Sequence, residues 1–381
     1  MNLFYFDNNA TTRVLPQVMQ AMQPWFCEQY GNPSSSHPLG QYARQALVTA
    51  HKAVAAFLNA TPAEIVFTSG ATESNHMAIL GALAADPARR KIVTSTVEHA
   101  STLRLLDHLA SHGVEVVQVP VDGGGALDLD ALAAAVTPDT ALVTLMHANN
   151  ETGVLFPITE AAAIAHVQGA LFHTDAAQTA GKIALDVSQL GCDLLSFSGH
   201  KLHAPKGVGV LFVRKGFAVA PLVHGHQERH RRGGTENLPA IVGLDVACRL
   251  AQQHLAGDPG QVALLRDRLE RELVKRIPAA RINGAGPRVP NTTSLCLAGH
   301  SGEELLHRLG QAGIMASQGS ACTAAGTDPS HVLLAMGLGR NDALSTIRFS
   351  LSRETTEAEI DIVLQSIIAL VRPAVSLPVA A

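Results

Sequence analysis

The sequence is poor in aromatic residues and in charge, and it lacks any long apolar run. Aromatic residues make up 4% of the 381 residues, with one tryptophan, and charged residues make up 16%. The net charge is −4 at pH 7. No basic cluster marks a face for phosphate backbones, which argues against nucleic-acid binding. No apolar run approaches the roughly 20 residues that span a bilayer, which argues against a membrane protein.

Cysteine is also scarce. The five cysteines are scattered and without CxxC spacing, at Cys27, Cys192, Cys248, Cys296 and Cys322. An odd number with this spacing argues against a disulfide framework and against a zinc knuckle. The N-terminus, MNLFYFDNNATT, has no basic region, so it does not resemble a secretory signal. We therefore expect a cytoplasmic protein with reduced thiols.

The chain does contain a regular alternation of short apolar strands and helical stretches. Most of the strands are continuous apolar runs, as expected where both faces of a sheet are covered. Strands are predicted over residues 64–69, 91–97, 114–121, 141–148, 170–176, 193–198 and 207–214, and helices over 74–85, 101–112 and 158–168. This order predicts an α/β fold with a mostly parallel central sheet flanked by helices.

The pattern changes near residue 256. A long helical stretch, QVALLRDRLERELVKRI, is followed by the separated strands NTTSLCL and STIRFSL. This order is typical of a smaller α+β unit. We expect a large domain over residues 15–255 and a small domain formed by residues 1–14 and 256–381.

Polar residues follow the predicted strands. They are Thr72, His99, Asn150, Asp175, Gln178 and the run from Ser198 to Lys201. Each has an ordinary explanation when taken alone, since a lysine is usually solvated and an aspartate often caps a helix. Because open α/β sheets bind ligands beyond the carboxyl ends of their strands, the set together favours one binding site.

The residue types in this set indicate a phosphorylated cofactor. The stretch SGATES places glycine and hydroxyl residues where a helix begins, which suits a monophosphate. Neither a GxGxxG after the first strand nor a GxxxxGK[ST] loop occurs. A phosphate site, the amine of Lys201 and the carboxylate of Asp175 together suit pyridoxal 5'-phosphate held as a Schiff base.

An ordered series of motifs then carries a family resemblance. The motifs are DNNATT, TSGATESNH, VEHAS, HANNETG, HTDAAQ, SFSGHKLHAPKGVG, QERHRRGGTEN, GSACT and TIRFSLS. From residue 4 to about residue 365 the chain resembles the cysteine desulfurases, which are related to the class-V aminotransferases. The resemblance implies a fold-type-I pyridoxal-phosphate-dependent transferase that acts as a homodimer.

The same resemblance implies roles for the residues within the motifs. Lys201 would join the cofactor aldehyde and move protons, Asp175 would pair with the pyridinium nitrogen, and His99 would stack on the ring and take part in acid–base steps. The remaining cofactor-binding residues would be Ala71, Thr72, Ser198 and His200 at the phosphate, Thr235 reaching it from the neighbouring subunit, and Gln178 at the ring oxygen. Asn150 and Arg348 would bind the substrate carboxylate.

Cys322 is the expected nucleophile. It lies in ASQGSACTAAGTDPS, where small side chains leave a thiol uncovered, whereas the other four cysteines lie in apolar or helical context. The resemblance implies that Cys322 takes sulfur from L-cysteine as a persulfide, with L-alanine as the other product. An acceptor protein or iron–sulfur scaffold would then receive the sulfur.

Other interpretations stay open at this point. A selenocysteine lyase or another class-V aminotransferase would not need Cys322, and a non-catalytic binding protein would leave Lys201 or Asp175 idle. The histidines His224, His226 and His230 depart from the family pattern. A metal site there is an alternative, but we predict that the protein holds no metal.

Overall fold

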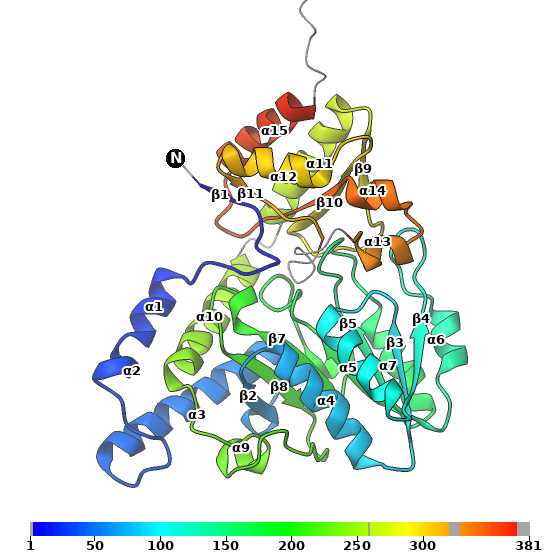
Figure 1. Ribbon diagram of the computed structural model, residues 1–381. Coiled ribbons are helices and arrows are strands. Elements are labelled where there is room, and N and C mark those ends of the chain that lie inside the picture. The colour runs from blue at the N-terminus through cyan, green and yellow to red at the C-terminus, as the bar shows by residue number, and fades with distance from the viewer. Residues whose placement is uncertain (1–2, 258–259, 320–327, 372–381) are drawn as a thin grey trace, which may run out of the picture.

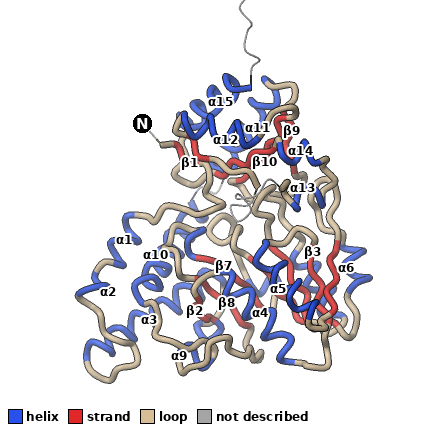
Figure 2. Tube along the Cα trace, in the orientation of Figure 1, coloured by secondary structure: helices blue, strands red, loops and turns tan. Residues whose placement is uncertain are grey.

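The computed structural model describes residues 3–257, 260–319 and 328–371. A larger body surrounds a seven-stranded sheet, and a smaller body sits above it, with the N-terminal segment running between the two (Figure 1). Figure 2 shows mostly loop segments where the two bodies meet. Ligand-binding residues are expected on such loops.

The central sheet has the strand order β2-β8-β7-β6-β5-β3-β4. β8 is antiparallel to both of its neighbours, and the other neighbouring pairs are parallel. The strands are β2 (Ile65–Thr68), β3 (Lys91–Ser95), β4 (Glu115–Val119), β5 (Thr140–Met146), β6 (Leu171–Asp175), β7 (Leu194–Ser198) and β8 (Gly209–Val213). All seven predicted strands are present, and the mostly parallel α/β sheet is confirmed.

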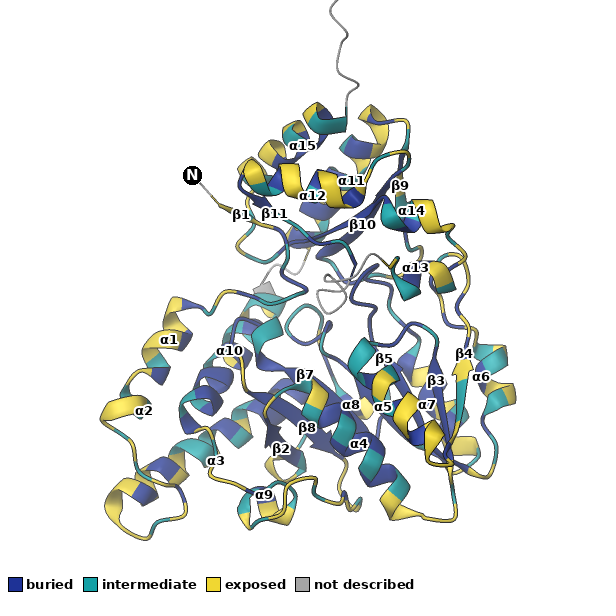
Figure 3. Cartoon of the chain, viewed as in Figure 1, coloured by how far each residue is buried: buried dark blue, intermediate teal, exposed yellow. Residues whose placement is uncertain are grey.

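Helices pack against this sheet, and Figure 3 shows buried strands between helices whose outer faces are exposed. They are α1 (Pro16–Met22), α2 (Pro24–Cys27), α3 (Pro38–Leu58), α4 (Ala71–Ala85), α5 (Ala100–Ser111), α6 (Leu129–Ala135), α7 (Ile158–Val167), α8 (Val187–Leu190), α9 (Gln227–His230) and α10 (Leu238–Gly257). The helices α4, α5 and α7 correspond to the three predicted ones. None of the helices within the described ranges is long and apolar enough to cross a membrane.

The smaller body contains two short sheets. β9 (Ala280–Asn283), β10 (Thr292–Leu297) and β12 (Thr346–Ser350) form an antiparallel sheet in the order β12-β10-β9, and β1 (Phe4–Tyr5) pairs in parallel with β11 (Ile314–Met315). Its helices are α11 (Gln261–Arg276), α12 (Gly302–Gln311), α13 (His331–Ala335), α14 (Arg340–Leu344) and α15 (Glu357–Val371). The N-terminal strand therefore joins segments that lie more than 300 residues further along the chain.

Buried apolar side chains follow the same arrangement. One cluster contains Val143, Phe172 and Phe197 of the central sheet, whereas a separate cluster joins Phe6 to Phe349 and the helices of the smaller body. The position of Phe6 in the second cluster supports a small domain that includes the N-terminus. We keep the division into residues 15–255 and residues 1–14 with 256–381 as a proposal.

Candidate active site

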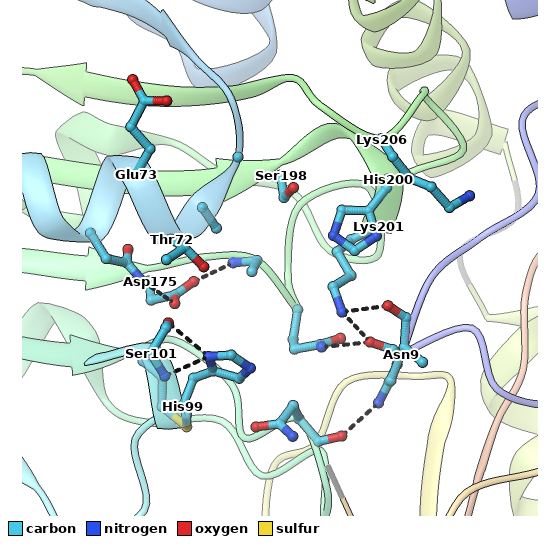
Figure 4. A pocket seen from close by; sticks show the side chains of 18 of the residues that line it. Asn9, Thr72, Glu73, His99, Ser101, Asp175, Ser198, His200, Lys201 and Lys206 are labelled. Atoms are coloured by element: carbon cyan, nitrogen blue, oxygen red, sulfur yellow. Dashed lines mark hydrogen bonds between the residues drawn. The ribbon is translucent and has the colours of Figure 1, made fainter. Parts of the chain in front are cut away.

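A cavity of about 400 Å³ opens at the carboxyl ends of the central strands. Its wall includes ten of the predicted site residues: Ala71, Thr72, His99, Asn150, Asp175, Gln178, Ser198, His200, Lys201 and Arg348. Figure 4 shows side chains from several strand ends converging on it. The structure brings these ten residues together around one cavity, and their individual chemical roles stay predictions.

Lys201 enters the cavity from a short turn, Gly199–Lys201, that directly follows β7. Its Nζ donates to the backbone oxygens of Asn9 (2.5 Å) and Ala10 (2.9 Å). Both acceptors belong to the N-terminal segment, which Figure 4 shows beside the lysine. The amine thus lies inside the protein and not in bulk solvent.

Asp175 ends β6 and presents its carboxylate to the cavity. Oδ2 accepts a hydrogen bond from Asn75 Nδ2 (2.6 Å) on α4, and Oδ1 accepts one from the backbone N–H of Ala177 (2.9 Å). These two donors fix the orientation of the carboxylate. Such a carboxylate can hold a cationic ring nitrogen.

His99 caps the N-terminus of α5. The backbone N–H of Ser101 donates to His99 Nδ1 (3.2 Å), so this nitrogen is the acceptor and the neutral ring carries its proton on Nε2. Burial lowers the pKa of His99, Lys201 and His331 lower it further, and Asp175 opposes the shift. The imidazole is therefore neutral at pH 7, which suits both stacking and proton transfer.

The N-terminus of α4 forms the opposite wall. Its N-cap residue is Gly70, and no side chain caps the first turn of this helix. Gly209 at the start of β8 lies against it, since a Cβ at Gly209 would come within 2.5 Å of the Gly70 Cα. Ser198 and His200 add polar groups beside these N–H donors. Uncapped helix N–H groups with a favourable dipole suit a phosphate.

His200 differs electrostatically from the lysines around it. Burial lowers its pKa to about 4, and Lys201 and Lys206 contribute in the same direction. The ring is therefore neutral at pH 7, and the positive charge beside the anion-binding wall comes from Lys201 and Lys206. Lys206 was not among the predicted site residues.

Arg348 lies in the middle of β12 and is 2% exposed. Its Nη1 donates to the backbone oxygen of Asn150 (3.0 Å), and its Nη2 forms an ion pair with Asp7 Oδ1 (2.7 Å). Within the part of the chain that the structure describes, its buried Nε has no hydrogen-bond partner. A buried guanidinium that lines a cavity with one donor unused is suited to a carboxylate ligand.

Two predicted site residues are not among these ten. Thr235 is exposed and does not line the cavity of its own chain, so its proposed role in a neighbouring subunit stays a prediction. Cys322 lies outside the described residues. Of the other cysteines, Cys192 and Cys248 are buried in apolar surroundings, and burial raises the pKa of Cys192 to about 12. Buried thiols of this kind are unreactive, which leaves exposed Cys27 as the natural control for Cys322.

Sequence reasoning missed the N-terminal contribution to the site. The motif DNNATT carried the resemblance, but no role was predicted for Asp7 or Asn9. The Asn9 side chain donates to the Asn150 backbone oxygen (3.0 Å) and to Thr292 Oγ1 (2.8 Å), and the Asn9 backbone oxygen accepts from Lys201. The sequence signal that could have indicated this contribution was the pair of adjacent asparagines, Asn8 and Asn9, after a short apolar stretch.

The fold and the cavity belong to a known enzyme family, because residues 4–363 match the family model described as aminotransferase class-V. The chain is 50% identical over 369 residues to a cysteine desulfurase of Cereibacter sphaeroides, covering 96% of this chain and 95% of that protein. A solved NifS-like protein superposes with a TM-score of 0.91 at 38% identity, covering 97% of this chain and 99% of that chain. The structure of SspA in complex with cysteine superposes with a TM-score of 0.82 at 34% identity, covering 91% and 98%. The chain therefore belongs to the class-V aminotransferase family and, within it, to the cysteine desulfurases.

Proposed function

We propose that the protein removes sulfur from L-cysteine, with pyridoxal 5'-phosphate as cofactor. L-cysteine and the Cys322 thiol give L-alanine and a Cys322 persulfide, so the carbon–sulfur bond breaks as a sulfur–sulfur bond forms. The observation that carries this proposal is the cavity itself, which combines the amine of Lys201, the carboxylate of Asp175 and the buried guanidinium of Arg348. The cysteine bound to the related SspA supports the choice of substrate.

The cavity fits the cofactor at three points. The uncapped N-terminus of α4, with Ala71, Thr72, Ser198 and His200, would hold the phosphate. Asp175 would hold the pyridinium nitrogen, Gln178 the ring oxygen and His99 one face of the ring. Lys201 would anchor the aldehyde carbon. When bound, the cofactor supplies an electron-withdrawing ring that weakens the bonds at the substrate Cα.

Arg348 and Asn150 would bind the substrate carboxylate. Among the described residues the Nε donor of Arg348 has no hydrogen-bond partner, and the ion pair with Asp7 at Nη2 helps to orient the guanidinium. A bidentate arginine fixes both the position and the direction of a carboxylate. The substrate would therefore arrive with its Cα held near the amine of Lys201.

Lys201 and His99 would move the protons. The Lys201 amine takes the proton from the substrate Cα and returns a proton to the product. Burial lowers the pKa of His99, so the ring enters the reaction neutral and readily gives up any proton that it accepts. The neutral ring also avoids repulsion with Lys201.

We also propose that the protein acts in the cytoplasm as a homodimer in which Thr235 reaches the partner's phosphate site. The persulfide would pass to an acceptor protein or iron–sulfur scaffold. The family relationship supports these finer statements, as does the exposed position of Thr235.

The test is alanine release from L-cysteine by the yellow, cofactor-loaded protein. Cys322→Ala should release no alanine, while Cys27→Ala, which removes another exposed thiol, should keep wild-type turnover. Lys201→Ala should not form the absorption band of the lysine-bound cofactor. Undiminished alanine release by Cys322→Ala would remove this cysteine from the mechanism, and turnover of L-selenocysteine alone would favour a selenocysteine lyase.

A further inference from the structure

Lys182 is a further lysine near the cavity, and the proposed chemistry does not use it. It lies seven residues after the end of β6. Lys182 Nζ donates to Gln178 Oε1 (2.8 Å) and to Asn9 Oδ1 (2.9 Å). No carboxylate within the described ranges forms an ion pair with it. Removing an amine from water without a counter-ion is costly even where the side chain is only half-buried, so its position calls for a reason.

The environment of Lys182 increases that cost. Lys182 is half-buried, and burial, with Lys201 and Arg348 adding to it, holds the pKa of Lys182 well below its usual value. Whether charged or neutral, the amine has at least two N–H donors. Both are used on the amide oxygens of Gln178 and Asn9.

These contacts fix how the Gln178 amide is turned. The backbone oxygen of Asn9 can only accept, and Gln178 Nε2 donates to it (3.1 Å). Lys182 holds the amide oxygen at the other end. If the Gln178 amide were flipped, its oxygen would lie against the backbone oxygen of Asn9, and its nitrogen would lie against the amine of Lys182. Of the two N–H bonds on Gln178 Nε2, one remains for a ligand in the cavity that Gln178 lines.

Lys182 also strengthens that remaining donor. A donor on the oxygen of an amide withdraws electrons from it and polarises the N–H bonds at the other end. Gln178 is 6% exposed, so water screens this effect little. Oriented and polarised in this way, the amide favours an oxygen acceptor over an apolar ring carbon.

We propose that Lys182 is a positioning residue for the cofactor, holding the Gln178 amide so that an N–H group meets the ring oxygen of pyridoxal 5'-phosphate. This inference depends on the proposed function, since it needs the cofactor in the cavity. It assigns a role to a residue outside the cavity wall, acting through Gln178.

The experiment compares pyridoxal 5'-phosphate with 3-deoxypyridoxal 5'-phosphate, which lacks the ring oxygen. Dissociation constants for the full-length apoprotein are measured by equilibrium dialysis. The wild type should prefer the complete cofactor, and Lys182→Met should reduce this preference about tenfold, as expected for loss of one strong hydrogen bond. A merely structural role would weaken both ligands alike and leave the ratio unchanged. Lys52→Met, at an exposed position of α3, is the matched control.

A double-mutant cycle tests the route through Gln178. Gln178→Leu should lower the preference as far as Lys182→Met, and the double variant should lower it no further. Additive effects, an unchanged ratio in Lys182→Met, or a wild-type ratio near one would each overturn the proposal. If Lys182→Met does not fold, Lys182→Gln carries the same expectation, because its amide can present either end to Gln178. A wild type that binds neither ligand would instead refute the proposed function.

Discussion

Arg348 shows how a charge can be kept in the interior for a ligand. Its guanidinium is buried, paired with Asp7 and bonded to the Asn150 backbone oxygen, yet its Nε has no partner among the described residues. An unsatisfied buried donor costs about 1–3 kcal/mol. A substrate carboxylate would satisfy it and so recover that cost on binding.

Lysine at position 348 should therefore weaken substrate binding more than it weakens the fold. A lysine keeps the charge but loses the planar fork of donors. We expect Arg348→Lys to raise the KM for L-cysteine about tenfold or more, measured by alanine release at varied substrate concentration. Arg13→Lys, in an exposed ion pair with Glu354, is the control and should leave KM unchanged. An unaltered KM in Arg348→Lys would contradict this assignment.

Glu98 is expected to make the free energy of unfolding depend on pH. It is 1% exposed, accepts hydrogen bonds from Ser95 Oγ and the Met146 N–H, and burial raises its pKa from 4.5 to about 8. In the unfolded chain the carboxyl ionises first as the pH rises. Unfolding then releases a proton, so the contribution of Glu98 to the free energy of unfolding falls between about pH 4.5 and pH 8.

Glu98→Gln should remove this dependence. Relative to the wild type, the variant should gain about 2–3 kcal/mol in the free energy of unfolding between pH 5 and pH 7.5. Urea unfolding at both pH values measures this change, and the difference between the two proteins cancels the titration of the buried histidines. A constant difference across that range would mean that Glu98 is ionised in the folded protein.

At the scale of secondary-structure elements, the close packing of β8 on the N-terminus of α4 shapes the wall that is proposed to hold the phosphate. Gly209 packs so closely on Gly70 that a Cβ would require one of the two backbones to move. Gly209→Ala should displace the start of α4 and weaken binding of pyridoxal 5'-phosphate about tenfold or more in equilibrium dialysis. Gly310→Ala in α12, where a Cβ meets nothing within 4 Å, should bind the cofactor as the wild type does. Equal affinity in both variants would argue against this wall as the phosphate site.

The composition of the individual strands and helices explains which of them could be predicted from the sequence. The strands of the central sheet were predictable because buried parallel strands read as continuous apolar runs, as in β5, which is buried along its whole length. α4 begins at Ala71, three residues before the predicted helix, because Gly70 ends the preceding turn and polar residues open the helix. β1 and β11 have two residues each, too few to form a periodic pattern.

The part of the site that depends on contacts between distant segments could not be predicted from the sequence. Residues at the carboxyl ends of parallel strands were expected to converge, and those of the cavity wall do. The pairs Asp7 with Arg348 and Asn9 with Lys182 join the N-terminal segment to distant elements. No local pattern records which segment docks on which, so neither Asp7, Asn9 nor Lys182 could be assigned.

At the scale of the whole molecule, the proposed dimer gives a complementation test. Two chains of 40.0 kDa should sediment together. Lys201→Ala removes the amine, and Thr235→Val removes the hydroxyl proposed to serve the neighbouring subunit. The two variants are mixed, dissociated and allowed to reassociate. Hybrid dimers should then have one intact site each. The mixture should show roughly a quarter of the wild-type activity at limiting cofactor. No restoration, with hybrids present, would mean that Thr235 serves its own chain or none.

Asn9 links three regions that lie far apart in the chain. Its backbone and side chain contact Lys201, Thr292 and Ser350, the last of them 341 residues away. The ribosome adds Ser350 long after it has added Asn9. A nascent polypeptide that ends before residue 348 therefore cannot complete the pocket to which Asn9 and Arg348 both contribute.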